Sequence, residues 1–257
     1  MIDKDFTGTK VIHGDILRVL PVLPDGVFGG VVTDPPYCSG GLFSNNRRAN
    51  TATKYLNVPG NFENFDDCKD QRSFTNWSLL WMTELFRVCK SGAPVCLFID
   101  WRQLPTISDV FQWAGFVWRG VVVWDKGNSR PQPGRFKQQA EFILWGSKGD
   151  MPLDRNAPYL SGVFTESMPS ANARVHQTQK PIRLLGEIIK VVEPGEIILD
   201  PFCGSGTTLV AAARAGYPAV GIDNSAYYAD IARRQLGGLS VARRGKEQLN
   251  LFLRGEA

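Results

Sequence analysis

The stretch EIILDPFCGSGTTLVAAA, residues 196–213, combines three local patterns that together indicate the fold. Residues 196–199 are a short apolar run, which predicts a buried strand ending at Asp200. A turn with two glycines follows, and a helical pattern then extends over residues 207–215. A strand, a glycine-rich turn and a helix in this order are typical of a parallel sheet with a ligand at the helix start.

The same alternation extends over most of the chain. Continuous apolar runs predict further buried strands at 10–13, 27–32, 94–99, 117–124, 141–145 and 219–222. Apolar residues at three- and four-residue spacing predict helices at 74–88, 104–114, 182–192 and 226–236. We therefore expect an α/β protein, a mostly parallel twisted sheet with helices on both faces. Segments 117–124 and 141–145 have no helix between them, which predicts an antiparallel pair at one edge.

Composition excludes several classes of protein. The chain has 257 residues, 43% hydrophobic and 21% charged, which is ordinary for a globular protein and argues against disorder. We expect a single domain over 1–257, with irregular insertions at about 38–73 and 147–180. No apolar run is long enough to span a membrane, and no apolar signal segment opens the chain. Five cysteines without a Cys-x-x-Cys motif then indicate reduced thiols in a cytoplasmic protein.

Metal and hydrolase chemistry have little support. The chain has two histidines, His13 and His176, and no set of ligands has the spacing of a zinc site, so we expect no metal. A Gly-x-Ser-x-Gly nucleophile motif is also missing.

The loop after residue 199 favours a nucleotide with a positive group. It lacks the lysine of a phosphate-binding loop, and Leu209 stands where a dinucleotide site needs its third glycine. Asp200 would repel a pyrophosphate but would attract an ammonium group. Asp223 follows 23 residues later, near the interval at which an acid reaches a ribose. An ordinary glycine-rich turn is the alternative for this loop taken alone.

A second loop, Asp34-Pro35-Pro36-Tyr37, also follows a predicted buried strand. Two prolines stiffen the backbone and remove two amide donors, which leaves the Asp34 carboxylate and the Pro35 carbonyl as acceptors. Tyr37 adds a flat ring. Such an edge suits an amino group with two N–H donors, held against an aromatic face. A rigid turn without function is the alternative.

Together the two loops resemble those of DNA amino-methyltransferases that use S-adenosylmethionine. Residues 34–37 are similar to the family's catalytic motif and residues 200–208 to its cofactor motif. The catalytic motif comes first, which is the permuted order of the family's β group. Further matching segments place the resemblance over residues 11 to about 236; they lie at 13–15, 124–126, 139–149, 176–181 and 221–223. The resemblance implies a Rossmann-like class I methyltransferase fold.

The resemblance also implies which residues bind the cofactor. The motif acid and glycines would hold its methionine part, the threonines and the 176–180 segment its carboxylate, and two further acids its ribose and adenine. The residues at those positions are Asp15, His176, Thr178, Lys180, Asp200, Phe202, Gly204, Gly206, Thr207, Thr208 and Asp223. Alternatively, His176 only caps backbone groups of its loop, and Lys180 is only a solvent-exposed charge at the start of a helix.

For catalysis, the resemblance implies that Asp34, Pro35, Pro36 and Tyr37 act on an exocyclic amine. Asp34 and the Pro35 carbonyl would accept its hydrogen bonds, and Tyr37 would stack on a base flipped out of the duplex. In the family, aspartate at the first position usually accompanies adenine, and serine cytosine. We therefore expect an adenine-N6 DNA methyltransferase. N4-cytosine methylation is the alternative, and an RNA adenine methyltransferase or a non-catalytic nucleic-acid-binding module ranks lower.

Basic residues in two loops indicate contact with double-stranded DNA. They are Arg47, Arg48 and Lys54 in one loop and Arg130, Arg135 and Lys137 in the other. A solvated charged loop is the alternative for each. The family suggests two further partners, a second copy of the chain and a cognate restriction enzyme.

Overall fold

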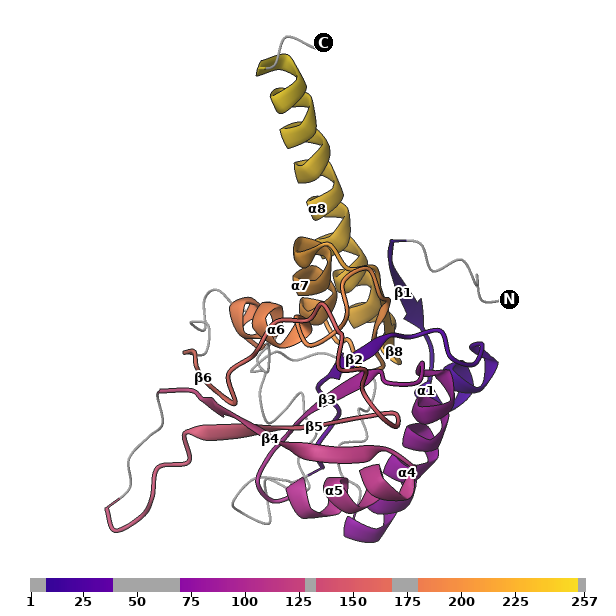
Figure 1. Cartoon of the computed structure of the whole chain (residues 1–257), viewed down its shortest axis with the longest axis vertical. Helices are drawn as coiled ribbons and strands as arrows, with labels where there is room; N and C mark the ends of the chain where they lie inside the picture. The colour runs from indigo at the N-terminus through magenta and orange to yellow at the C-terminus, as the bar shows by residue number, and fades with distance from the viewer. Residues whose placement is uncertain (1–7, 39–69, 128–132, 168–179, 254–257) are drawn as a thin grey trace.

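The computed structural model describes residues 8–38, 70–127, 133–167 and 180–253, with side chains as far as residue 239. Its strands form one eight-stranded sheet in the order β1-β8-β7-β2-β3-β5-β4-β6 (Figure 1). Only β5 runs antiparallel to its neighbours among these strands, so the mostly parallel sheet is confirmed. The strands are β1 (Thr9–His13), β2 (Gly30–Thr33), β3 (Pro94–Ile99), β4 (Val117–Asp125), β5 (Ala140–Ser147), β6 (Val163–Thr165), β7 (Ile198–Asp200) and β8 (Ala219–Asp223).

Each of the seven predicted strands is present, with its ends shifted by up to three residues. Strands β4 and β5 pair antiparallel as predicted, and a further strand, β6, lies outside them at the edge, parallel to β4. Strand β6 falls inside the 147–180 segment that the sequence presents as irregular. It has three residues, two of them exposed, and a segment this short is below the length at which a sequence pattern predicts a strand.

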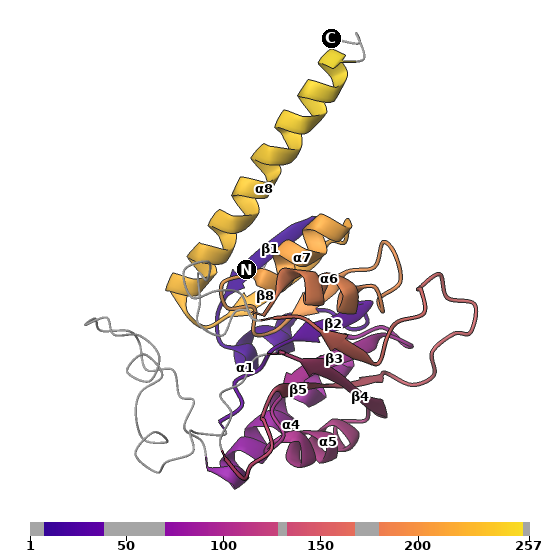
Figure 2. The same ribbon diagram turned by 90° about the vertical axis from the view of Figure 1, so that its left-hand side faces the viewer.

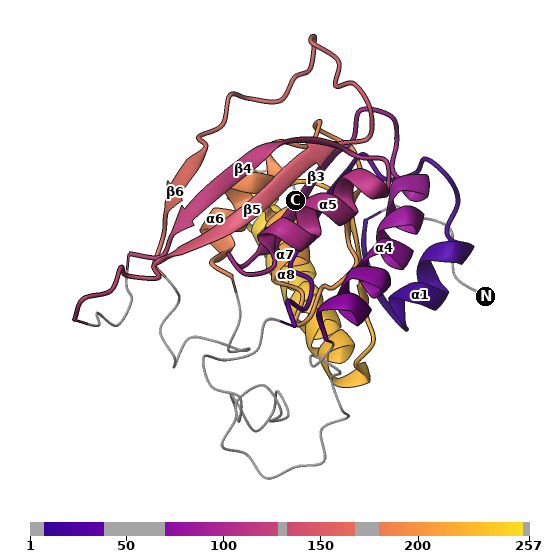
Figure 3. The ribbon, with the colours of Figure 1, turned by 90° about the horizontal axis from the view of Figure 1, so that it is seen from below.

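Helices cover both faces of the sheet, as predicted. One face carries α1 (Ile16–Val19), α4 (Gln71–Val88) and α5 (Leu104–Trp113), and the other carries α6 (Ile182–Ile189) and α7 (Thr207–Ala215) (Figures 1 and 3). A short 3-10 helix, η1 (Leu20–Val22), extends α1; neither is among the predicted helices. Strand residues alternate between the two apolar clusters: Leu199 packs with α4, and its neighbour Ile198 packs with α6.

The last helix, α8 (Ala226–Leu253), is longer than the predicted helix at 226–236. Its first turns pack on β1, β8 and α7 and bury Ala229 and Ala232. Its remaining length extends away from the sheet (Figures 1 and 2). Among the described helices, none has the length and apolar character needed to cross a membrane.

The carboxyl ends of five parallel neighbouring strands each lead into an acid. In sheet order from β1 to β3 these are Asp15, Asp223, Asp200, Asp34 and Asp100. The chain runs from β7 to β8 in one direction along the sheet and from β2 to β3 in the other. The connections therefore diverge between β7 and β2, and open α/β sheets bind ligands at such a point.

Candidate active site

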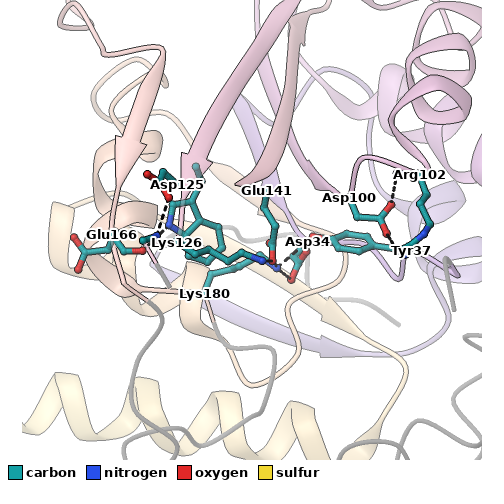
Figure 4. Close-up of polar contacts among 11 residues, drawn as sticks. Asp34, Tyr37, Asp100, Arg102, Asp125, Lys126, Glu141, Glu166 and Lys180 are labelled. Atoms are coloured by element: carbon teal, nitrogen blue, oxygen red, sulfur yellow. Dashed lines mark hydrogen bonds and ion pairs between the residues drawn. The ribbon is translucent and has the colours of Figure 1, made fainter. Parts of the chain in front are cut away.

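The segment after β2 forms a compact polar corner (Figure 4). The Tyr37 hydroxyl donates a hydrogen bond to Asp34 Oδ1 at 2.5 Å. The Lys180 ammonium, which follows the 168–179 segment and precedes α6, donates to Asp34 Oδ2 at 2.7 Å. Both oxygens of the Asp34 carboxylate are thus held by fixed donors, and each retains a second lone pair for a further donor.

Lys180 links Asp34 to a second acid, Glu141 at the start of β5. Lys180 Nζ lies 3.4 Å from Glu141 Oε2, and Lys126 Nζ lies 3.1 Å from Glu141 Oε1. Burial acts to lower the pKa of Lys180, but the charges of Asp34 and Glu141 outweigh it, so the pKa is raised. Burial likewise acts to raise the pKa of Glu141, and the two lysines outweigh it. Lys180 and Glu141 are therefore both charged at neutral pH.

Tyr37 is neutral at this corner. Burial, and then the nearby charge of Asp34, raise the pKa of its hydroxyl well above the ordinary value. The hydroxyl therefore keeps its proton and donates a hydrogen bond to Asp34. Its ring lies under the Lys180 ammonium, 5.5 Å from Nζ to the ring centroid.

The catalytic corner is tied directly to the glycine loop. Thr33, the last residue of β2, donates its hydroxyl to Asp200 Oδ1 at 2.6 Å, and Asp200 ends β7. Asp200 is 2% exposed, and burial raises its pKa to about 6 although hydrogen bonds from Thr33 and Thr208 act to lower it. Residues 34 and 200, far apart in the sequence, thus lead into neighbouring loops.

The start of α7 can receive an anion. Gly206 precedes the helix with φ of 87°, and no side chain among the described residues caps the first amides. A methyl group added at Gly204 would meet no atom of the described part of the chain within 4 Å. A buried acid beside uncapped helix amides fits a ligand that carries both an ammonium and a carboxylate, as the methionine part of S-adenosylmethionine does.

The two remaining acids lie along the same edge. Asp223 Oδ2 accepts from the Gly204 amide at 2.9 Å, and its other oxygen accepts from the Ser225 amide at 2.8 Å. Asp15 caps α1 by accepting from the Leu17 amide at 2.9 Å. The Gly14 amide donates to the Asp223 backbone carbonyl at 2.9 Å, so Asp15 and Asp223 are neighbours.

The structure brings most of the predicted site together. Along the carboxyl edge lie Asp15, Asp34, Pro35, Pro36, Tyr37, Asp200, Phe202, Gly204, Gly206, Thr207, Thr208 and Asp223. Arg135 and Lys137 are exposed between β4 and β5, whose linked ends lie at the same edge. Outside the described residues lie His176, Thr178, Arg47, Arg48, Lys54 and Arg130.

Lys180 lies against the catalytic loop. It contacts Asp34 and Tyr37, whereas the resemblance to the family implies a role at the cofactor's carboxylate, which stays a prediction. Glu141 and Lys126 are polar residues of the site that the sequence reasoning missed. The available signal was an acid opening an apolar strand, in the segments 139–149 and 124–126 that already matched the family.

Known proteins confirm the resemblance. A family model for N6/N4 methyltransferases, described as DNA methylase, matches residues 29–234. The chain belongs to this DNA methylase family. A type II methyltransferase of Haemophilus influenzae, M.HinfI, is 27% identical to this chain. The matched region covers 91% of this chain and 69% of M.HinfI.

Solved structures share the fold of this DNA methylase. The crystal structure of the M1.HpyAVI–SAM complex is 23% identical, with a TM-score of 0.62 over 89% of this chain and 98% of that chain. The PvuII DNA methyltransferase, described as cytosine-N4-specific, is 17% identical, with a TM-score of 0.67 over 89% and 86% of the two chains. The class I methyltransferase fold expected from the sequence is confirmed.

Proposed function

We propose that this DNA methylase transfers a methyl group from S-adenosylmethionine to the N6 amino group of adenine in double-stranded DNA. The observation that carries the proposal is the Thr33–Asp200 hydrogen bond of 2.6 Å. It holds a loop suited to an amine beside a loop suited to the methionine part of the cofactor. Two groups that must exchange a methyl carbon have to be held in contact.

Different residues of the chain would bind different parts of the cofactor. Asp200 would take the ammonium group, and the amides of Thr207 and Thr208 would take the carboxylate. Asp223 would bind the ribose hydroxyls and Asp15 the adenine amino group. Bound there, S-adenosylmethionine supplies a methyl carbon on a positively charged sulfur.

The catalytic loop makes a poor nucleophile reactive. The lone pair of an exocyclic amine is delocalised into the base. The free lone pairs of Asp34 and the Pro35 carbonyl would accept hydrogen bonds from the two amine N–H groups and draw the nitrogen toward tetrahedral geometry. As the N–CH3 bond forms, the S–CH3 bond of the donor breaks, and one amine proton is then released to solvent. Tyr37 provides the aromatic face against which the flipped base lies.

Adenine is proposed over cytosine because aspartate at the first position of the catalytic motif, here Asp34, usually accompanies adenine in the family that the chain resembles. N4-cytosine methylation is the second candidate, since the PvuII enzyme has the same fold. Methylation of duplex oligonucleotides, followed by digestion to nucleosides, distinguishes the two. We expect N6-methyladenine, and N4-methylcytosine alone would contradict the adenine proposal.

The assignment of Asp34 is tested by replacing it. Asp34→Ala leaves the methionine site in place, so binding of S-adenosylmethionine measured by calorimetry should change little. Methyl transfer to DNA should fall by at least about 100-fold, because one of the two acceptors of the amine is lost. Transfer at the parent rate would show that the catalytic site lies elsewhere.

DNA would lie along the carboxyl edge of the sheet of a single domain, near the 38–73 insertion and the later part of the 147–180 insertion. The expectation that all of 147–180 faces DNA is wrong for its start, because Ser147 pairs with Pro94 at the opposite edge and the Gly92 amide donates to the Lys148 carbonyl there. Arg47, Arg48 and Lys54, with Arg130, Arg135 and Lys137, are the phosphate contacts we propose. A homodimer, a cognate restriction enzyme and a cytoplasmic location stay predictions from the sequence.

A further inference from the structure

Lys180 is a positioning residue for Asp34, we propose, and Glu141 anchors Lys180 in turn. The inference rests on the methyl-transfer function proposed above and assigns Lys180 to the base side of the reaction. It differs from the sequence-based assignment, in which Lys180 binds the cofactor's carboxylate.

The first argument is the set of contacts around the ammonium group. Three oxygens surround it: Asp34 Oδ2 at 2.7 Å and Tyr37 Oη at 3.2 Å accept its hydrogen bonds, and Glu141 Oε2 lies 3.4 Å from Nζ as an ion pair. The ring of Phe98 lies 5.3 Å from Nζ and closes another side. Lys180 is 8% exposed, so its charge is compensated by these residues rather than by water.

The second argument is the effect on the reacting carboxylate. Tyr37 holds one oxygen of Asp34 and Lys180 holds the other, so the carboxylate cannot rotate about its terminal bond. Its remaining lone pairs then have fixed directions, which the amine of the base must meet. A misplacement of about 1 Å in such a group can lower a rate about 100-fold.

The third argument is charge balance. Two acids, Asp34 and Glu141, alternate with two lysines, Lys180 and Lys126 (Figure 4). Glu141 contacts the two lysines, so its influence on Asp34 passes through Lys180. Without Glu141, the Lys180 ammonium would have Asp34 as its one acidic partner among these residues. It would then be free to turn toward the cofactor's carboxylate.

The test separates turnover from cofactor binding. Lys180→Met should lower kcat about 100-fold, because Asp34 loses one of its two fixed donors. The Kd of S-adenosylmethionine, measured by calorimetry, should stay within about threefold of the parent value, because Asp200 and the α7 amides are untouched. Lys180→Arg keeps the charge and should recover at least about tenfold of the lost kcat.

A double-mutant cycle tests the role of Glu141. Glu141→Gln alone should lower kcat by less than Lys180→Met does, and the double variant should be no slower than Lys180→Met alone. Additive losses would show that Glu141 acts independently and would overturn the anchoring role. The matched control is Lys190→Met, which removes an exposed lysine from its ion pair with Glu187 and should leave kcat unchanged.

Two results would overturn the assignment of Lys180. A weakened Kd for S-adenosylmethionine, with near-parental kcat at saturation, would place Lys180 on the cofactor. An unchanged kcat in folded Lys180→Met, with folding confirmed by its unfolding curve, would remove the positioning role. Failure of the parent protein to methylate any DNA would instead overturn the proposed function, and this inference with it.

Discussion

Asp200 is a carboxylic acid in a position that favours its protonated form. It is buried at the end of β7, and its pKa is raised to about 6, above the ordinary value of 3.8. In the folded protein without ligand, the group therefore holds its proton more tightly than in the unfolded chain. Its contribution to stability is fully present below about pH 4 and is lost as pH rises through 6.

Asp200→Asn should therefore stabilise the fold at neutral pH. Asparagine keeps an acceptor for the Thr33 hydroxyl and cannot ionise. We expect the free energy of unfolding in urea to rise by about 1–3 kcal/mol at pH 7, and by about 2 kcal/mol less at pH 4.5. Affinity for S-adenosylmethionine should fall at least tenfold, since the ammonium loses its counter-charge. A variant less stable than the parent at pH 7 would contradict the argument.

At the scale of one element, α7 depends on the glycine that precedes it. Gly206 has φ of 87°, and a methyl group there would lie 2.8 Å from the Ala232 side chain of α8. Gly206→Ala should therefore cost both backbone strain and a displacement of α8, about 2–4 kcal/mol of unfolding free energy.

Gly216→Ala is the matched control at the other end of α7. Gly216 has nearly the same φ, 86°, and a methyl group there meets nothing within 4 Å. We expect this variant to lose about 1 kcal/mol, from backbone strain alone. Equal losses at the two glycines in thermal or urea unfolding would show that contact with α8 is unimportant.

The segment between β4 and β5 is the described part of the proposed DNA interface. Arg135 and Lys137 are exposed there, and Phe136 between them is fully exposed. In Arg135→Ala/Lys137→Ala, the slope of log Kd against log salt for duplex DNA should become shallower by about 2, because each phosphate contact adds about 0.9. The Kd of S-adenosylmethionine should not change. An unaltered salt slope would exclude these two side chains from the interface.

Local sequence patterns predicted most of the described strands and helices. They did not predict a very short edge strand, β6, or a single-turn helix, α1. The buried strands β2, β3 and β8 are continuous apolar runs because helices cover both of their faces. Strand β6 carries no such run, and α1 has a single turn that begins at the Asp15 cap. Pairing with β4 makes β6 a strand, and this contact is not encoded in its own three residues.

At the scale of the whole molecule, α8 separates into a packed part and a projecting part. The packed part includes Ala229, Ala232 and Arg233, whose guanidinium donates to the Val11 carbonyl at 3.3 Å. A chain that ends at residue 239 keeps these contacts, and Gly237 and Gly238 suit a helix end. Its melting temperature and its affinity for S-adenosylmethionine should therefore match those of the full chain.

A loss of several degrees in melting temperature would show that the projecting part of α8 stabilises the fold. Sedimentation of both chains also tests the predicted homodimer. Dimerisation of the full chain alone would place the contact on this part of the helix.

The sequence predicts most residues of the site, but it does not predict which of their side chains contact one another. Asp34 and Asp200 each stand in a motif that a reader of the sequence can identify. Lys180 and Asp34 are separated by 146 positions, and Glu141 lies on a strand between them in the sequence. Such pairings arise from sheet order, which no local pattern records, so Lys180 received a different role from sequence alone.

The hydrogen bond between Thr33 and Asp200 joins the loop proposed to receive the base to the loop proposed to bind the cofactor. Asp34 follows Thr33 directly. A ligand that binds the Asp200 carboxylate can therefore change the position of Asp34, which is proposed to receive the base. Thermodynamic reciprocity then requires that cofactor and DNA change each other's affinity by one common factor. When that factor favours joint occupancy, the protein that holds the methyl donor binds its DNA target more tightly than the free protein does.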